Sequence, residues 1–330
     1  MSGHRSGNRS KRRRFLRRGI SFPVRPWGVG LGLLLLLCAP AAARDIRLGI
    51  LPVVDTLPLR VAEEESLFEG EGLCVEIVSF QSALERDAAL QAGRLDGYFG
   101  DLLNTLLLVR SGVDLRILTT AFHTRPDARM FGIAAAPGAG VQDLEALRGR
   151  SVAISRATVI EYLLDRILAA QGKEPGFVKK EEIKKMPIRL QMLLSGNVPA
   201  ALLPEPLLTL AESRGATVVA DDRVLDTALT VIALRLELLE GRPDLPERFL
   251  RAYGRALTWI GDHPKAAMEL LTARTRFPPE MKGRYRLPGF PGVGAPSRRD
   301  VEEARAWIAQ QGLAEGTPGY EEVVWSPERP

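Results

Sequence analysis

Two patterns of apolar and polar positions alternate along most of this chain. Short apolar runs, typical of buried strands, are followed by stretches in which apolar residues recur at helical spacing. The runs predict strands at 46–54, 75–80, 95–99, 114–122, 151–154, 198–203 and 217–220, with helices between them. Strands that alternate with helices indicate an α/β fold with mostly parallel sheets covered by helices on both faces.

One part of this pattern occurs twice. Residues 91–101 and 194–206 each read as a helix ended by glycine, a tight turn, a short apolar strand and a carboxylate, which is Asp101 in the first copy and Glu205 in the second. Residues just beyond such strand ends lie where open α/β sheets bind ligands. The repeat therefore predicts two lobes that close on one small molecule.

The remaining segments complete this plan. Residues 183–186 form a short segment before a helix expected at 188–194, and 130–136 and 227–234 predict two extended crossover strands that form a hinge. Helices are expected at 245–260, 264–273 and 298–311, and the Pro- and Gly-rich stretch 277–296 is expected to be a surface loop. We expect lobe I to comprise 44–130 and 234–330, and lobe II to comprise 131–233.

The first 43 residues resemble a signal peptide. A basic front around Arg12 is followed by an apolar run at 29–38 and by small residues up to Ala43. We expect cleavage near Ala43 and a periplasmic mature protein, exported by the Sec or the twin-arginine route. An uncleaved membrane anchor and a lipid on Cys38 are the alternatives.

Removal of this leader changes the charge balance of the chain. The leader holds nine Lys or Arg and no acid, so 36 basic residues face 40 acidic ones in the mature chain. The high isoelectric point belongs to the leader, and a nucleic-acid partner is not indicated. The mature length suffices for two ordinary domains.

The mature chain carries few residues suited to catalysis. His123 and His263 lie far apart, and Cys74 falls in an apolar strand, where a small hydrophobic role is expected. We find no cluster with metal-ligand spacing, no Gly-rich phosphate loop and no nucleophile elbow. No catalytic residue, metal or cofactor is therefore predicted.

Binding is better supported, because five loops fall at the carboxyl ends of predicted strands. Helix-start N–H groups can bind acceptors there, carboxylates can bind donors, and aromatic rings can form flat walls. The predicted ligand-binding residues are Asp55, Thr56, Leu57, Ser82, Tyr98, Gly100, Asp101, Phe122, Ser155, Arg156, Thr158, Tyr162 and Glu205.

Several of these residues have a second, purely structural interpretation. Asp55 is equally suited to capping the helix that follows it, and Arg156 is either an anion clamp or a solvated helix-start residue. Glu205 lies between two prolines, which leave its backbone few conformations to lose on binding. It is the strongest single candidate.

At these positions the chain resembles periplasmic solute-binding proteins of ABC importers, in the nitrate, sulfonate, taurine and thiamine-pyrimidine-like group. The matching stretches are 55–58, 61–63, 67–68, 72–76, 92–97, 147–153 and 196–206. Pro199 departs from the family, which usually has Asp there, whereas Asp96 keeps that feature in the first copy.

The resemblance implies a type II periplasmic-binding fold, a small-molecule ligand and an ABC permease as membrane partner, with the protein itself a monomer. A ligand-sensing module for a receptor would need the same lobes, and an enzyme on the same fold is a further alternative. Three acids and several aromatics in the predicted loops favour a neutral or N–H-bearing heteroaromatic, such as a vitamin precursor. A sulfonate-like ligand would depend on Arg156.

Overall fold

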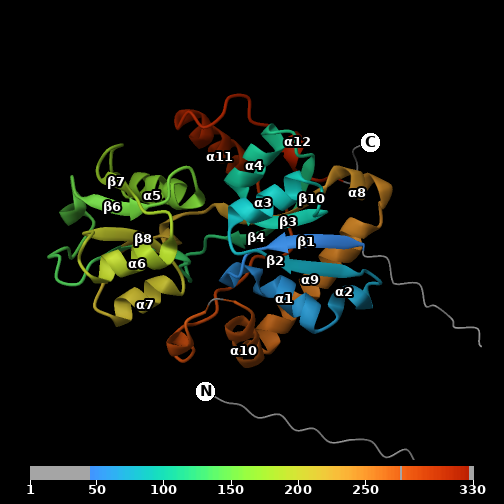
Figure 1. The fold of residues 1–330 in the computed structure, drawn as a ribbon, viewed down its shortest axis with the longest axis horizontal. Helices are drawn as coiled ribbons and strands as arrows, with labels where there is room; N and C mark the ends of the chain where they lie inside the picture. The colour runs from blue at the N-terminus through green and yellow to red at the C-terminus, as the bar shows by residue number, and fades with distance from the viewer. Residues whose placement is uncertain (1–44, 276, 327–330) are drawn as a thin grey trace, which may run out of the picture. The chain divides into compact units, whose positions relative to one another are not determined.

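The computed structural model describes residues 45–275 and 277–326, so the predicted leader, Cys38 and the cleavage site lie outside the described residues. The described chain forms two α/β lobes (Figure 1). Among these residues, no helix combines the length and the apolar character needed to cross a membrane.

Lobe I is built on a five-stranded sheet with the order β2-β1-β3-β10-β4. β10 runs antiparallel to both of its neighbours, whereas β1 pairs in parallel with β2 and β3. The strands are β1 (Ile46–Ile50), β2 (Val75–Ser79), β3 (Gly97–Asp101), β4 (Leu115–His123) and β10 (Ala228–Arg235).

Lobe II repeats this topology in a second sheet, with the order β7-β6-β8-β5-β9. Here β5 is the antiparallel strand, between β8 and β9, and β6 pairs in parallel with β7 and β8. The strands are β5 (Phe131–Ala135), β6 (Ser151–Ile154), β7 (Lys179–Glu182), β8 (Ala200–Pro204) and β9 (Thr217–Asp221).

Helices cover both faces of each sheet, as the apolar runs predicted (Figure 1). In lobe I, α3 and α4 lie on one face and α1, α2 and α9 on the other; in lobe II, α5 lies opposite α6 and α7. Their bounds are α1 (Leu57–Glu64), α2 (Leu67–Gly70), α3 (Ala83–Gln91), α4 (Leu102–Arg110), α5 (Val159–Ala170), α6 (Met186–Leu194), α7 (Leu207–Ser213) and α9 (Leu245–Asp262).

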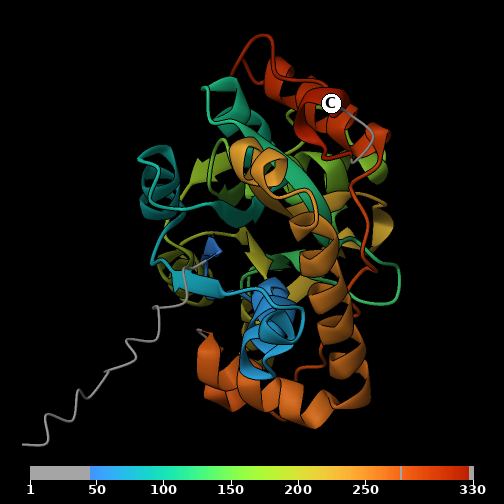
Figure 2. The ribbon, with the colours of Figure 1, turned by 90° about the vertical axis from the view of Figure 1, so that its right-hand side faces the viewer.

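The chain after β10 returns to lobe I. Figure 2 shows α9 passing beside α1, with α10 (Pro264–Arg274) next to it, and both helices contact α1. α8 (Leu236–Gly241) precedes them, α11 (Arg298–Gln310) packs on α4, and α12 (Tyr320–Val323) follows. Short 3-10 turns occur at η1 (Val54–Thr56), η2 (Glu145–Leu147), η3 (Asp222–Val224) and η4 (Pro279–Met281).

Two short crossover segments, 124–130 and 222–227, connect the lobes, and hydrogen bonds join them to each other. At the lobe I end, the Thr124 N–H donates to the Thr227 carbonyl at 3.0 Å, and the Thr227 N–H donates to Thr124 Oγ1 at 2.9 Å. At the lobe II end, the Met130 N–H donates to Asp222 Oδ1 at 3.0 Å. The crossovers therefore form one hydrogen-bonded unit.

The predicted two-lobed fold is confirmed, but three local predictions differ from the structure. The segment expected as the second crossover strand is β10, which pairs inside the lobe I sheet, so the chain returns to lobe I before residue 228. The segment expected as the first crossover strand is likewise β5, inside the lobe II sheet. The apolar pattern identified the buried strands β5 and β10, whereas the crossovers themselves are short, largely polar segments that this pattern does not mark.

The strand β7 (Lys179–Glu182), which precedes the short segment 183–186, was not predicted from the sequence. Its sequence is entirely charged, because β7 is an edge strand with partly exposed side chains and charges discourage pairing with another chain. An apolar pattern therefore could not locate it.

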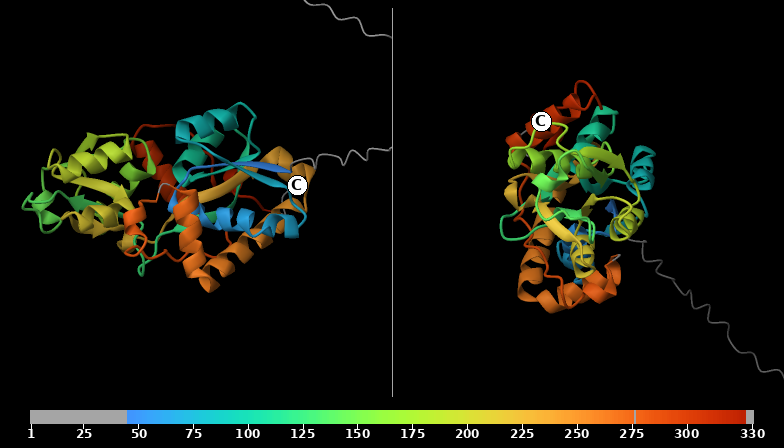
Figure 3. Two further views of the ribbon diagram at one scale, coloured as in Figure 1. Left: turned by 60° about the horizontal axis from the view of Figure 1, so that its bottom comes forward. Right: turned by 90° about the vertical axis from the view of Figure 1, so that its left-hand side faces the viewer.

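The stretch 277–296, expected on the surface, instead buries several side chains. Phe277, Met281 and Tyr285 are at most 9% exposed. Gly294 anchors the far end of the stretch on β4, where its carbonyl accepts a hydrogen bond from the Thr120 N–H at 2.7 Å. In Figures 1 and 3 the orange segment after α10 lies beside α7 of lobe II, where Glu280 is 3.5 Å from Arg214.

Candidate functional site

The first predicted site residues follow β1, at the carboxyl edge of the lobe I sheet. Asp55 is 8% exposed, and its Oδ2 accepts a hydrogen bond from Thr230 Oγ1 on β10 at 2.8 Å. Burial raises the pKa of Asp55 to about 6, although the Thr230 hydrogen bond acts in the opposite direction. Thr56 donates to the Val53 carbonyl at 2.7 Å, and Leu57 is buried at the start of α1. Asp55 does not cap α1 with its side chain.

Two further lobe I candidates cap helices. Ser82 accepts a hydrogen bond from the Glu85 N–H at the start of α3, and Asp101 accepts one from the Asn104 N–H at 2.7 Å at the start of α4. Burial raises the pKa of Asp101, because the ionised carboxylate is removed from water, which does not happen at an exposed helix cap.

The aromatic candidates of lobe I lie in its core. Tyr98 is fully buried, with its hydroxyl 2.6 Å from Thr105 Oγ1 and the Arg86 guanidinium over its ring. Phe122 is 1% exposed on β4. Gly100 packs under the Tyr98 ring, where an added Cβ would lie 2.2 Å from a ring carbon. In this structure the Tyr98 hydroxyl is therefore hydrogen-bonded within lobe I.

In lobe II, the candidates after β6 form a hydrogen-bonded turn. Ser155 accepts a hydrogen bond from the buried Arg189, and Thr158 caps α5 through the Ile160 N–H at 3.2 Å. The Arg156 side chain is 51% exposed and donates to the Lys180 carbonyl on β7 at 2.9 Å. Arg156 therefore lies along the sheet edge, with part of its donor capacity already used.

Tyr162 lies at a contact between the lobes. Its ring meets Trp307 of α11 edge-on, with centroids 5.6 Å apart. Trp307 also donates to Asp165 at 2.9 Å, and Arg166 of α5 pairs with Glu303 of α11 at 2.6 Å. Because α11 packs on α4, these contacts join lobe II to lobe I on the α5 side.

Glu205, the strongest sequence candidate, is 6% exposed and bonded on both oxygens. Oε1 accepts from Arg129 Nε at 2.8 Å, and Oε2 accepts from the Thr209 N–H at 3.0 Å and from Thr209 Oγ1 at 2.7 Å. Arg129 also pairs with Glu212. The charge of Glu205 is therefore neutralised by Arg129, which lies in the first crossover.

One buried tyrosine with an unpaired hydroxyl was not suggested by the sequence. Tyr285 is 9% exposed, its ring packs against Phe277 at 5.4 Å, and its hydroxyl is buried without a hydrogen-bond partner. Burial, followed by the negative charges of Glu205 and Asp55, raises the pKa of Tyr285. These two carboxylates come from lobe II and lobe I respectively, so the hydroxyl lies within the electrostatic reach of both.

Two buried arginines were also missed by the sequence interpretation. Arg86 donates to the Phe99 carbonyl at 2.8 Å, and Arg189 donates to the Leu202 carbonyl at 3.2 Å, so each ties a helix to the strand that follows it. Arg86 pairs with Asp87 at 2.7 Å, whereas burial lowers the pKa of Arg189 to about 10. Arg86 and Arg189 are separated by the same number of residues as Gly93 and Gly196, the glycines that end the two repeated helices. The repeat in the sequence could therefore have indicated this pair of arginines.

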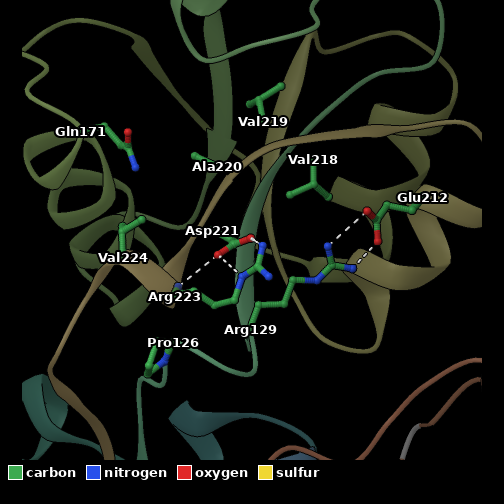
Figure 4. Close-up of a pocket in the computed structure, with 10 residues that line it drawn as sticks. All are labelled: Pro126, Arg129, Gln171, Glu212, Val218, Val219, Ala220, Asp221, Arg223 and Val224. Atoms are coloured by element: carbon green, nitrogen blue, oxygen red, sulfur yellow. Dashed lines mark hydrogen bonds and ion pairs between the residues drawn. The ribbon is translucent and has the colours of Figure 1, made fainter.

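Two surface cavities are found in lobe II, away from most of the predicted residues. The first, of about 570 Å³, lies at the β9 edge (Figure 4). Its charged groups face one another in pairs, Arg129 with Glu212 and Arg223 with Asp221. The second, of about 450 Å³, lies beside α6 and Arg214. In residues 45–275 and 277–326 we find no group of three or more His, Cys, Asp or Glu arranged to hold a metal ion.

The family model described as "NMT1-like family" matches residues 39–273, which is more than half of the chain. The chain belongs to the NMT1-like family. It is 26% identical over 235 residues to a Bacillus subtilis (strain 168) protein named for aliphatic sulfonates binding, a match that covers 69% of this chain and 68% of the relative.

Solved structures with printed solute-binding names share the fold of this chain at low sequence identity. The periplasmic aliphatic sulphonate binding protein SsuA from Escherichia coli superposes with a TM-score of 0.73 at 16% identity, covering 85% of this chain and 97% of that one. The alkanesulfonate-binding protein SsuA from Xanthomonas axonopodis pv. citri, bound to MOPS, gives 0.69 at 17% identity, with coverages of 85% and 97%. This NMT1-like chain therefore shares the fold of these two sulfonate-binding proteins.

Proposed function

We propose that this protein is the extracytoplasmic solute-binding component of an ABC-type importer. It captures one small organic solute between lobe I and lobe II and delivers it to a membrane permease. The predicted leader supports export to the periplasm, and the protein acts as a monomer. The family and the fold support the assignment to solute-binding proteins. The two lobes and their crossovers support capture of the solute by closure.

The observation that carries the proposal is the pair of sheets with matching strand order, joined by two short crossovers. The hydrogen bonds at Thr124–Thr227 and at Met130–Asp222 make the crossovers a single hinge element. A solute that touches both lobes binds the closed state better than the open state, and this difference shifts the population toward closure. The closed surface then differs from the open one, which lets a permease recognise loaded protein.

The predicted residues supply the polar groups for capture. Asp55 and Asp101 lie at the carboxyl edge of the lobe I sheet, and Ser155 and Thr158 lie at the corresponding edge of lobe II. The start of α5 adds backbone N–H groups that can bind an acceptor. In this proposal, these groups are the donors and acceptors that each lobe offers to the solute.

A thermal-shift screen of the mature chain tests the proposal. The panel contains neutral pyrimidines, alkanesulfonates and nitrate, and each is also incubated with the protein and analysed for conversion. A ligand at 100 times its Kd stabilises the folded state by about 2.7 kcal/mol. We expect one class to raise the melting temperature and to be recovered unchanged. Chemical conversion of the ligand, or the absence of any shift together with no small molecule in native mass spectrometry, would contradict the proposal.

A further inference from the structure

The two lobes each contain a buried arginine at the same place in the repeat, but the two charges have different surroundings. Arg86 in lobe I and Arg189 in lobe II each donate to a carbonyl of the strand that follows them. Arg86 also pairs with Asp87 at 2.7 Å. At the position that matches Asp87, lobe II has Leu190, so an apolar side chain replaces the acid.

Arg189 holds its charge without a carboxylate beside it. Its side chain is fully buried, and no carboxylate oxygen of residues 45–275 and 277–326 lies within 4 Å of its guanidinium nitrogens. Burial lowers the pKa of Arg189 to about 10, so the guanidinium stays protonated at neutral pH. A buried charge without a counter-ion is costly, and an anion that comes near it offsets part of that cost.

Ser155 connects this buried charge to the carboxyl edge of the lobe II sheet. It directly follows β6, and its Oγ accepts a hydrogen bond from Arg189 Nη2. The single proton of the hydroxyl is then left to donate elsewhere. It is directed at the Lys184 carbonyl at 3.3 Å, which is longer than the roughly 2.5–3.0 Å usual for such a bond. Because Ser155 is half-buried, its O–H can turn to an acceptor on a solute.

The acids of α5 near this edge have cations of their own. Glu161 pairs with Lys180 at 3.0 Å and lies 3.7 Å from Arg156. Asp165 pairs with Lys180 at 2.8 Å. Neither acid is therefore free to compensate the buried guanidinium behind Ser155.

We propose that Arg189 is a positioning residue that makes lobe II the half of the site which binds an anionic group of the solute, with Ser155 as the residue that touches this group. The inference rests on the proposed function and names its class of solute, one that carries an oxyanion such as a sulfonate or a carboxylate. Arg189 acts through Ser155, because a fully buried guanidinium does not reach the solute. The bound anion compensates Arg189 as Asp87 compensates Arg86 in lobe I.

A carboxylate placed beside Arg189 tests this role. Leu190→Asp supplies the acid that lobe I has at the matching position, and Leu190 lines the second surface cavity, which leaves room for it. Leu190→Asn is the matched control, because it removes the same apolar side chain without adding a charge. Ser155→Ala removes the hydroxyl that touches the solute and keeps the inference falsifiable if Leu190→Asp fails to fold.

Wild type and the three variants are titrated by calorimetry with ethanesulfonate, propionate and nitrate as anionic probes and with cytosine as a neutral probe. Melting temperatures without ligand are recorded in parallel. We expect an anionic probe to bind wild type, and its affinity to be about tenfold lower in Leu190→Asp than in Leu190→Asn. Ser155→Ala should weaken the same probe about tenfold relative to wild type.

A purely structural role for Arg189 would change the melting temperature of Leu190→Asp but leave its affinity equal to that of Leu190→Asn, and this result would overturn the inference. Unchanged affinity in Ser155→Ala would overturn it as well. Binding of cytosine alone would overturn it while leaving the proposed function standing. Binding of no probe at millimolar concentration would also overturn it, whereas the proposed function fails only if native mass spectrometry finds no small molecule on the purified protein.

Discussion

The carboxylate of Asp222 accepts a hydrogen bond from the backbone N–H of Met130 at 3.0 Å, so one crossover segment holds the other. Burial raises the pKa of Asp222 to about 7, against the opposing effect of hydrogen bonds from the Met130 and Phe131 backbone. The hinge therefore contains a carboxyl group that titrates near neutral pH.

This titration predicts a pH dependence of stability. The pKa of Asp222 rises from 3.8 to about 7 on folding, so the group stabilises the folded state fully below about pH 4 and loses that contribution as the pH rises through 7. The loss is on the order of 4 kcal/mol. Asp222→Asn removes it while keeping an acceptor for Met130, so the variant should gain stability relative to wild type as the pH increases from 4 to 8.

Chemical denaturation at several pH values measures this difference. Asp262→Asn, at the exposed end of α9, is the control and should follow wild type at every pH. A constant difference between Asp222→Asn and wild type across this range would show that Asp222 titrates at its ordinary value.

The Arg129–Glu205 pair should matter more for stability than an exposed pair of the same type. Arg129→Met leaves the buried Glu205 carboxylate without its cation, which we expect to lower the free energy of unfolding by about 3 kcal/mol. Arg125→Met breaks the exposed Arg125–Asp127 pair of the first crossover and should cost less than about 1 kcal/mol. Urea denaturation of both variants compares them; equal losses would contradict the role assigned to burial.

Gly97, the first residue of β3, is required by a close approach of β10. A Cβ at this position would lie 2.6 Å from the Ala233 carbonyl oxygen and 2.2 Å from the Leu234 side chain. Gly97→Ala should therefore destabilise lobe I by about 1–3 kcal/mol. Gly261→Ala, on α9 with open space around it, should be neutral or stabilising by up to about 1 kcal/mol. Thermal unfolding distinguishes them, and a neutral Gly97→Ala would argue against this packing.

Asp101→Asn separates capping from ligand binding. Asn caps helices as well as Asp does, and burial already disfavours the Asp101 carboxylate, so the variant should be as stable as wild type at pH 8. If Asp101 also binds an N–H group of the solute, affinity in a calorimetric titration falls about tenfold. Unchanged affinity would leave Asp101 as a helix cap.

The two lobes could be predicted from the sequence because short local patterns indicate most of their strands and helices. Buried strands, glycine-ended helices and a repeated turn identify β3 and β8 from a few residues each. The charged edge strand β7 escaped the apolar pattern, and the antiparallel placement of β10 depends on pairing with distant β3. Neither feature has a local signal.

The site was less predictable than the fold because it depends on long-range partners. Asp101 was placed correctly at a strand end, but the Arg129 that neutralises Glu205 lies 76 residues away in the sequence. Tyr285 comes from a Pro- and Gly-rich stretch whose composition suggested a surface loop. Only the folded chain brings Tyr285 within reach of carboxylates from both lobes.

Closure of the lobes on a solute is tested most directly by small-angle X-ray scattering of the mature protein, with and without a saturating amount of the ligand found by thermal shift. We predict a smaller radius of gyration in the bound state, at one ligand per chain. Stoichiometric binding with an unchanged scattering curve would mean that the solute is held by one lobe alone, and would contradict capture by hinge closure.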